Sequence, residues 1–140
     1  MSLFLVPIAI MFGVQALKMF AEGLNGKFSW QHLNNYGGMP SAHTALLGSL
    51  TFMLIYNYGW NSDSAAISLI LLFIVIRDAL GFRWQLGIHA QIINRLIKDL
   101  PDKMEYKYPV LNERLGHTAL EVAVGLLIGI LTSYLFLVIV

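Results

Sequence analysis

Two histidines in this sequence stand where long apolar runs begin. His43 lies in GGMPSAHTALLG, from Gly37 to Gly48, and His117 lies in RLGHTALEVAVG. An imidazole near neutral pH can act as a nucleophile, a general acid or a general base. The structural alternative is that each histidine only occupies the first turn of a helix, with Pro40 and Ser41 starting the one that contains His43.

Glu121 follows His117 by four residues, which places both side chains on one face of a helix. This spacing suits an imidazole nucleophile that is oriented by a carboxylate. Thr118 and Glu121 also spell a capping box, in which the glutamate accepts hydrogen bonds at the helix start. One carboxylate cannot fully serve both roles, so the sequence leaves both open.

Further ionisable residues end other apolar runs. Lys18 follows Gln15 by one helical turn, and Asp78 and Arg83 lie in RDALGFRWQLG. The structural alternatives are a lysine that reaches the membrane interface and an ion pair at a helix end. Two imidazoles beside cations are what phosphoryl transfer through a phosphohistidine requires, because cations stabilise the phosphate oxygens while one ring attacks and another protonates the leaving oxygen. Such chemistry needs no metal or other cofactor.

The apolar runs themselves predict an all-α integral membrane protein. Of the 140 residues, 57% are hydrophobic and only 12% are charged. A membrane-crossing helix needs about 20 mostly apolar residues. We expect residues 1–140 to form a single membrane-embedded domain with four spans: Leu3 to Ala21, Ser41 to Tyr58, Ala65 to Ile76 with a continuation through Ala79, and Thr118 to Val140.

The long connection from Arg83 to His117 holds six of the nine Lys and Arg residues. Within it, QIINRLIKDL is amphipathic and predicts a short interfacial helix, and PDKMEYKYP, between Pro101 and Pro109, predicts a turn. The positive-inside rule places this connection in the cytoplasm and both termini outside. Because spans alternate in direction, all the ionisable residues named above should form one layer at that face.

Several classes of partner and site are disfavoured or left as rivals. A net charge of +1 without a basic stripe gives no reason to expect nucleic acid, and without cysteine there is no disulfide framework or thiolate site. Gly125 and Gly129 form a small-residue packing face that could support a homodimer. A zinc site is a rival hypothesis, with ligands from His43, His89, His117 and Glu121.

At these motifs the chain resembles the divergent branch of the type 2 phosphatidic-acid phosphatase and vanadium haloperoxidase superfamily. The resemblance covers nearly the whole chain and is carried by GGMPSAH, by D-A-x-G-F-R from Asp78 to Arg83, by LGHTALEV and by Gln15-x-x-Lys18. It implies a metal-independent lipid phosphate phosphatase with His117 as nucleophile, Glu121 as its orienting carboxylate, His43 as general acid, and Lys18 and Ser41 as phosphate ligands. We place Asp78 and Arg83 in the phosphate-binding group.

The sequence departs from the parent superfamily at several positions. Ala42 replaces a glycine and Glu121 an aspartate, and no Arg-Pro follows Lys18. The parent's arginine six residues before the nucleophile falls on Leu111, so Arg83 is the first candidate for its role and Arg114 the second. Four spans in place of about six suggest a reduced core that a dimer would complete.

The expected substrate is a membrane lipid phosphate, either phosphatidylglycerol-phosphate-like or isoprenoid, reached from the cytoplasmic side of a bacterial inner membrane. The alternative is a protein that binds or transports a phosphate or phospholipid head group without turnover.

Overall fold

The computed structural model describes residues 2–24, 38–99, 108–113 and 115–139. Its regular elements are α1 (Ser2–Leu24), α2 (Ala42–Tyr58), α3 (Asp63–Arg77), the π-helical turn η2 (Asp78–Phe82), α4 (Arg83–Lys98) and α5 (Ala119–Ile139). No strand occurs among these residues. The all-α class is therefore confirmed.

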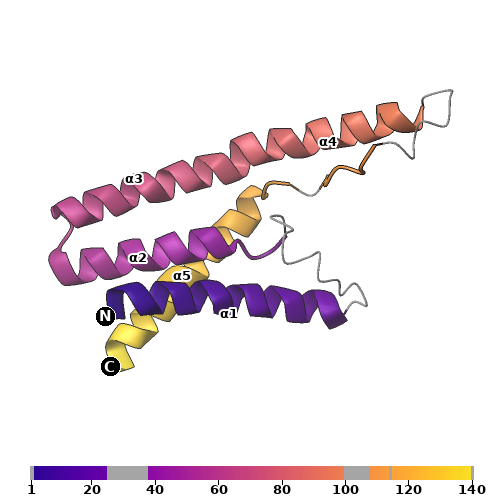
Figure 1. Ribbon diagram of the computed structural model, residues 1–140. Helices are drawn as coiled ribbons and strands as arrows, with labels where there is room; N and C mark the ends of the chain where they lie inside the picture. The colour runs from indigo at the N-terminus through magenta and orange to yellow at the C-terminus, as the bar shows by residue number, and fades with distance from the viewer. Residues whose placement is uncertain (1, 25–37, 100–107, 114, 140) are drawn as a thin grey trace.

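Within the described residues, three helical stretches are long and apolar enough to cross a membrane: Leu3–Ala21, Asp63–Lys98 and Ala119–Ile139. The remaining helix, α2, has 17 residues, which corresponds to about 25 Å. It contacts α1, α3 and α5 and lies at the centre of the bundle (Figure 1). That α2 is the fourth membrane span stays a prediction.

The third helix differs from its prediction, because α3, η2 and α4 follow one another without a break and form one long rod (Figure 1). The segment from Gln91 is the end of this rod, so the separate interfacial helix is wrong. The sequence from Asp78 to Lys98 contains no proline. Gly81 and Gly87 lower helix propensity by about 1 kcal/mol each without breaking a helix.

Helices α2 and α5 pack closely through small residues. A Cβ atom added to Gly129 would collide with the carbonyl oxygen of Ala45, and one added to Gly125 would collide with backbone atoms of α2's start. Ser49 and Ser133, both fully buried, share a hydrogen bond of 2.6 Å across the same interface. The glycine face that suggested a homodimer is thus occupied by α2 of the same chain.

The connection that leads back to α5 lies along α4. The Asn94 side-chain amide donates to the carbonyl oxygen of Leu111 at 2.9 Å and to Glu113 at 2.8 Å, and its oxygen accepts the Leu111 N–H at 3.0 Å. Nearer the bundle, the backbone at Leu115 passes close to Gly87 of α4. A Cβ added to Gly87 would lie 2.8 Å from the Leu115 carbonyl oxygen. These contacts return the chain to the point where His117 begins α5. The predicted turn between Pro101 and Pro109 falls almost entirely outside the described residues.

Candidate active site at the converging helix ends

Two backbone hydrogen bonds join helix ends that are far apart in the sequence. The N–H of Ser41, just before α2, donates to the carbonyl oxygen of Glu121 in the first turn of α5 at 3.2 Å. The N–H of His117 donates to the carbonyl oxygen of Ala79 in η2 at 3.1 Å. The starts of α2 and α5 and the end of α3 therefore meet at one face of the bundle, away from the two chain termini (Figure 1).

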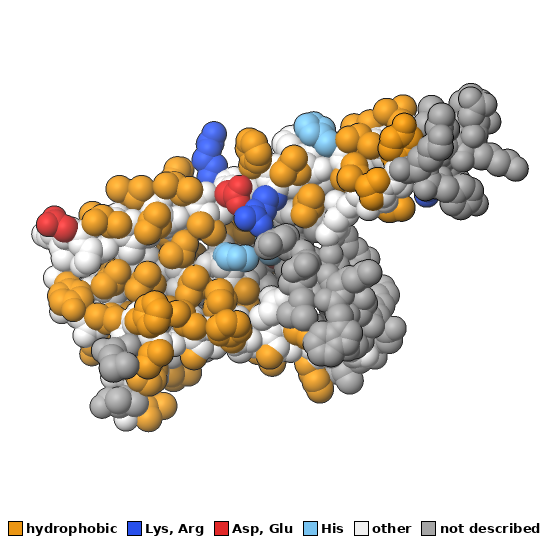
Figure 2. All heavy atoms as spheres, in the orientation of Figure 1, with side chains coloured by type: hydrophobic (Ala, Val, Ile, Leu, Met, Phe, Trp, Pro, Cys, Tyr) orange, Lys and Arg blue, Asp and Glu red, His pale blue; other side chains and the backbone are white. Residues whose placement is uncertain are grey.

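The ionisable residues expected in one layer surround this meeting point. Lys18 of α1 and His117 are buried, with 6% and 7% of their surface exposed. His43 is exposed and interacts electrostatically with Arg83, Asp78 and Lys18. Figure 2 shows acidic, basic and histidine side chains gathered beside the long rod, on a face that is otherwise mostly hydrophobic.

Buried polar atoms without a hydrogen-bond partner are rare in folded proteins, and each calls for an explanation. Among the described residues there are three: Ser41 Oγ, Thr51 Oγ1 and His117 Nδ1. Two of the three belong to residues that the sequence assigns to the site. Ser41 is the residue before α2, yet its hydroxyl makes no capping bond, so the simple helix-cap reading does not account for this side chain.

Glu121 serves the helix start. Its carboxylate oxygen Oε2 accepts the Thr118 N–H at 2.9 Å, and the Thr118 hydroxyl accepts the Glu121 N–H at 3.3 Å. This is the capping box that was one of the two alternatives. The carboxylate makes no hydrogen bond to His117 Nδ1, although its charge still acts on the ring electrostatically.

Burial lowers the pKa of His117 below its usual range, because the cationic ring would lose its hydration. The Glu121 charge opposes this shift, whereas Lys18, His43 and Arg83 add to it. His117 is therefore kept neutral near pH 7, with an unprotonated nitrogen.

The π-helical turn orients Asp78 and Arg83 toward each other. The Arg83 backbone N–H donates to the Asp78 carbonyl oxygen five residues earlier. Because a π turn takes more residues than an α turn, side chains five apart come onto one side. The Arg83 Nε donates to Asp78 Oδ2 at 2.6 Å, and both side chains remain partly exposed. The ion pair thus forms, and π turns of this kind are frequent at functional sites.

Other candidates lie outside this cluster. Arg114 is not among the described residues, so Arg83 is the arginine whose placement at the site can be seen. His89 lies on α4, exposed and beyond the meeting point. In the described parts of the chain, no three His, Asp or Glu side chains are grouped as metal ligands, so the four proposed zinc ligands do not come together.

The structure adds positions that sequence reasoning missed. Thr44 is fully buried, and its hydroxyl lies 3.1 Å from the Ser41 carbonyl oxygen and 3.4 Å from that of Val122, linking α2 to α5. Gly116 has a φ of 92°, and a Cβ there would lie 2.6 Å from the Trp84 nitrogen, so the chain can pass the start of α4 closely only with glycine. The glycine before His117 is visible in the sequence and is typical of a tight backbone position. No sequence pattern indicates that the Ala79 carbonyl oxygen accepts the His117 N–H.

Comparisons with known proteins agree with this description. "Uncharacterized membrane protein YuiD" of Bacillus subtilis (strain 168) is 36% identical to this chain over 118 residues, covering 76% of this chain and 75% of that protein. No solved structure matches the chain. This relative and the three apolar helices support a membrane location. A family model described as "Divergent PAP2 family" matches residues 1–132, and the chain belongs to that family.

Proposed function

We propose that this protein is a metal-independent phosphatase that hydrolyses a membrane lipid phosphate through a phosphohistidine on His117. The observation that carries the proposal is the pair of unpartnered buried atoms, Ser41 Oγ and His117 Nδ1, at the point where the ends of three helices meet. The open Ser41 hydroxyl beside buried Lys18 suits an anionic ligand with several oxygens, and the buried Nδ1 of His117 is the ring nitrogen opposite the one that attacks.

In this mechanism Nε2 of His117 attacks the phosphorus, and the bond from phosphorus to the lipid oxygen breaks. His43, as the imidazolium, gives its proton to the departing oxygen. Water then attacks the phosphohistidine, loses a proton to the now neutral His43, and releases inorganic phosphate. Lys18, Arg83 and the Ser41 hydroxyl stabilise the phosphoryl oxygens in both steps.

The proposed substrate class rests on the side of the membrane at which the site would lie. If α2 crosses the membrane as the fourth span, the converging helix ends share one face with the long Lys- and Arg-rich connection. The positive-inside rule places that face in the cytoplasm. A phosphatidylglycerol-phosphate-like or isoprenoid phosphate lipid would then reach the site from the cytoplasmic leaflet.

The direct test is phosphate release from such lipids by purified protein in mixed micelles containing EDTA. The His117→Ala protein should lose the activity and the acid-labile phosphoprotein formed during turnover. His89→Ala, which removes an exposed histidine on α4, should keep both. Activity that survives His117→Ala would reject the mechanism.

A second candidate, head-group binding without turnover, is favoured by one observation: the Glu121 carboxylate caps α5 and makes no hydrogen bond to the imidazole. Glu121→Gln separates the two, because glutamine also serves a capping box but carries no charge. For a phosphatase, Glu121→Gln should keep the stability of the wild type and lower kcat. Glu121→Ala should in addition lose about 0.3–1.5 kcal/mol of stability with the capping box. Lipid binding without phosphate release by any of these proteins would favour the second candidate.

A further inference from the structure

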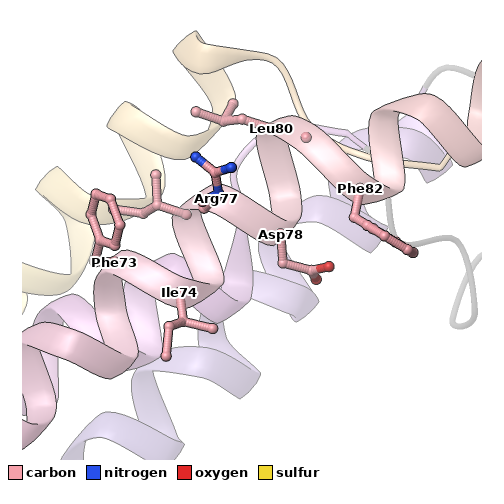
Figure 3. Close-up of a pocket in the computed structure, with 8 residues that line it drawn as sticks. Phe73, Ile74, Arg77, Asp78, Leu80 and Phe82 are labelled. Carbon is pink, nitrogen blue, oxygen red and sulfur yellow. The ribbon is translucent and has the colours of Figure 1, made fainter.

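An open surface cavity of about 740 Å³ lies along one stretch of the rod, at the end of α3 and in η2 (Figure 3). Its walls include the apolar side chains of Phe73, Ile74, Leu80 and Phe82 and the charged groups of Arg77 and Asp78. Phe73, Ile74, Leu80 and Phe82 are exposed on the surface of the bundle. On a membrane-spanning helix, such a surface faces lipid.

Arg77 belongs to this cavity and not to the ion pair of η2. In Figure 3 its side chain and that of Asp78 project to different sides of the helix. Asp78 is bound to Arg83, whereas Arg77 is exposed and has no hydrogen bond or ion pair with another described residue. Its guanidinium is thus available to a ligand that approaches from the lipid side.

The position of Arg77 along the membrane normal indicates which kind of ligand its guanidinium can meet. Helix α3 has 15 residues from Asp63 to Arg77, which corresponds to about 21 Å at roughly 1.5 Å per residue. The exposed rings of Tyr58 and Trp60 mark the membrane boundary near Asp63. Because the hydrocarbon core is about 30 Å thick, Arg77 lies inside its far edge, and the exposed Leu80 and Phe82 continue the apolar surface beyond it.

A guanidinium at that depth is costly unless it is paired or reaches a polar group. In a bilayer, the anionic groups closest to the edge of the hydrocarbon core are lipid phosphates. The planar guanidinium of arginine can donate two parallel hydrogen bonds to phosphate oxygens. The apolar wall next to Arg77 supplies a surface for the hydrocarbon chains of the same lipid.

We propose that this cavity binds an intact anionic phospholipid of the surrounding bilayer, with its phosphodiester on Arg77 and a hydrocarbon chain along Phe73 toward the α2–α3 turn. This lipid site adjoins the proposed phosphatase centre at Asp78, but lipid binding there uses Arg77 and does not require turnover. It would draw head groups inward beside the helix ends where His43 and His117 lie.

The test counts lipids bound to the full chain by native mass spectrometry, in protein exchanged into mixtures of phosphatidylglycerol and phosphatidylcholine. Phosphatidylglycerol has a phosphodiester, which a phosphomonoesterase does not cleave. We expect the wild type to prefer phosphatidylglycerol and Arg77→Gln to bind it about tenfold more weakly or worse, since a charged hydrogen bond is lost. Arg95→Gln removes an exposed arginine of α4 and should bind like the wild type.

Two further variants serve as controls for folding and for independence from the phosphatase proposal. Arg77→Lys keeps the charge without the fork and should bind at an intermediate level, which answers the objection that Arg77→Gln is misfolded. His117→Ala should bind phosphatidylglycerol fully, so failure of the phosphatase proposal leaves this one standing. Equal binding by Arg77→Gln and the wild type, or no preference over phosphatidylcholine, overturns the lipid site. Displacement of the lipid by millimolar inorganic phosphate would identify a site for free anions instead.

Discussion

His117 brings together several opposing physical effects at a single side chain. Its ring is buried and its Nδ1 lacks a partner, while the nearest carboxylate is engaged by the start of α5. Burial and the surrounding cations disfavour the imidazolium, and Glu121 favours it. The balance yields a neutral ring, which is the form that a nucleophile must have.

The lowered pKa of His117 predicts a specific pH dependence. The folded state resists protonation of this ring, so its contribution to stability is complete above the unfolded pKa of about 6.5. It decreases as the pH falls from there through the lower pKa of the folded state. The acid limb of kcat/KM should accordingly lie below about pH 6.5.

Phosphate release and thermal unfolding, both followed from about pH 7.5 to 5, test this dependence. His117→Asn should flatten the pH dependence of the melting temperature in that window. An acid limb at or above pH 6.5 would show that the ring is not shielded as described.

At the scale of elements, α2 organises the bundle. It contacts three other helices, and its interface with α5 relies on glycines that admit the opposing backbone. That interface also sets the Ser41-to-Glu121 hydrogen bond at the site. Packing between these two helices and the geometry of the site are therefore coupled.

Gly129→Ala should destabilise the protein by about 1–3 kcal/mol, because the new methyl group must push α5 away from Ala45. Gly13→Ala is the matched control: Gly13 is also helical, but nothing lies within 4 Å of the added Cβ. Thermal unfolding in a single detergent compares the two. If the two variants have equal melting temperatures, the close approach of α2 and α5 is not important for stability.

The elements also show what the sequence could and could not predict. Apolar length located the four main helices to within a few residues, and three helical stretches of the described chain are long and apolar enough for a membrane to account for that length. The continuity of α3 with α4 was missed, since the polar residues after Arg77 resemble a helix end although no residue there breaks a helix. The motif pieces indicated which side chains could meet, but the η2 turn and the choice of Glu121 as a cap depend on tertiary contacts that spacing does not encode.

At the scale of the whole molecule, the chain presents two unlike ends. The chain termini and the α2–α3 turn lie at one end of the bundle, and the converging helix ends and the projecting α4 lie at the other (Figure 1). The rod from Asp63 to Lys98 has 36 residues, or about 54 Å, which exceeds the hydrocarbon core of about 30 Å. Part of α4 therefore extends beyond the membrane core.

The proposed orientation predicts opposite labelling of the two ends. The chain contains no cysteine, so Asn61→Cys in the exposed α2–α3 turn and Gln91→Cys on exposed α4 each carry a single thiol. A membrane-impermeant maleimide added to intact cells should label the first and should reach the second only after permeabilisation. The reverse pattern would move the site to the outer face and exclude a cytoplasmic-leaflet substrate.

The two bonds that join Ser41 to Glu121 and His117 to Ala79 use only main-chain atoms. Main-chain groups are the same whichever amino acid occupies a position, so replacing any of these residues by another non-proline type leaves the donors and acceptors in place. The scaffold can thus tolerate exchange of its chemically active groups while its shape persists. Substitutions of the side chains at these positions can therefore change or remove a chemical activity without requiring a different fold.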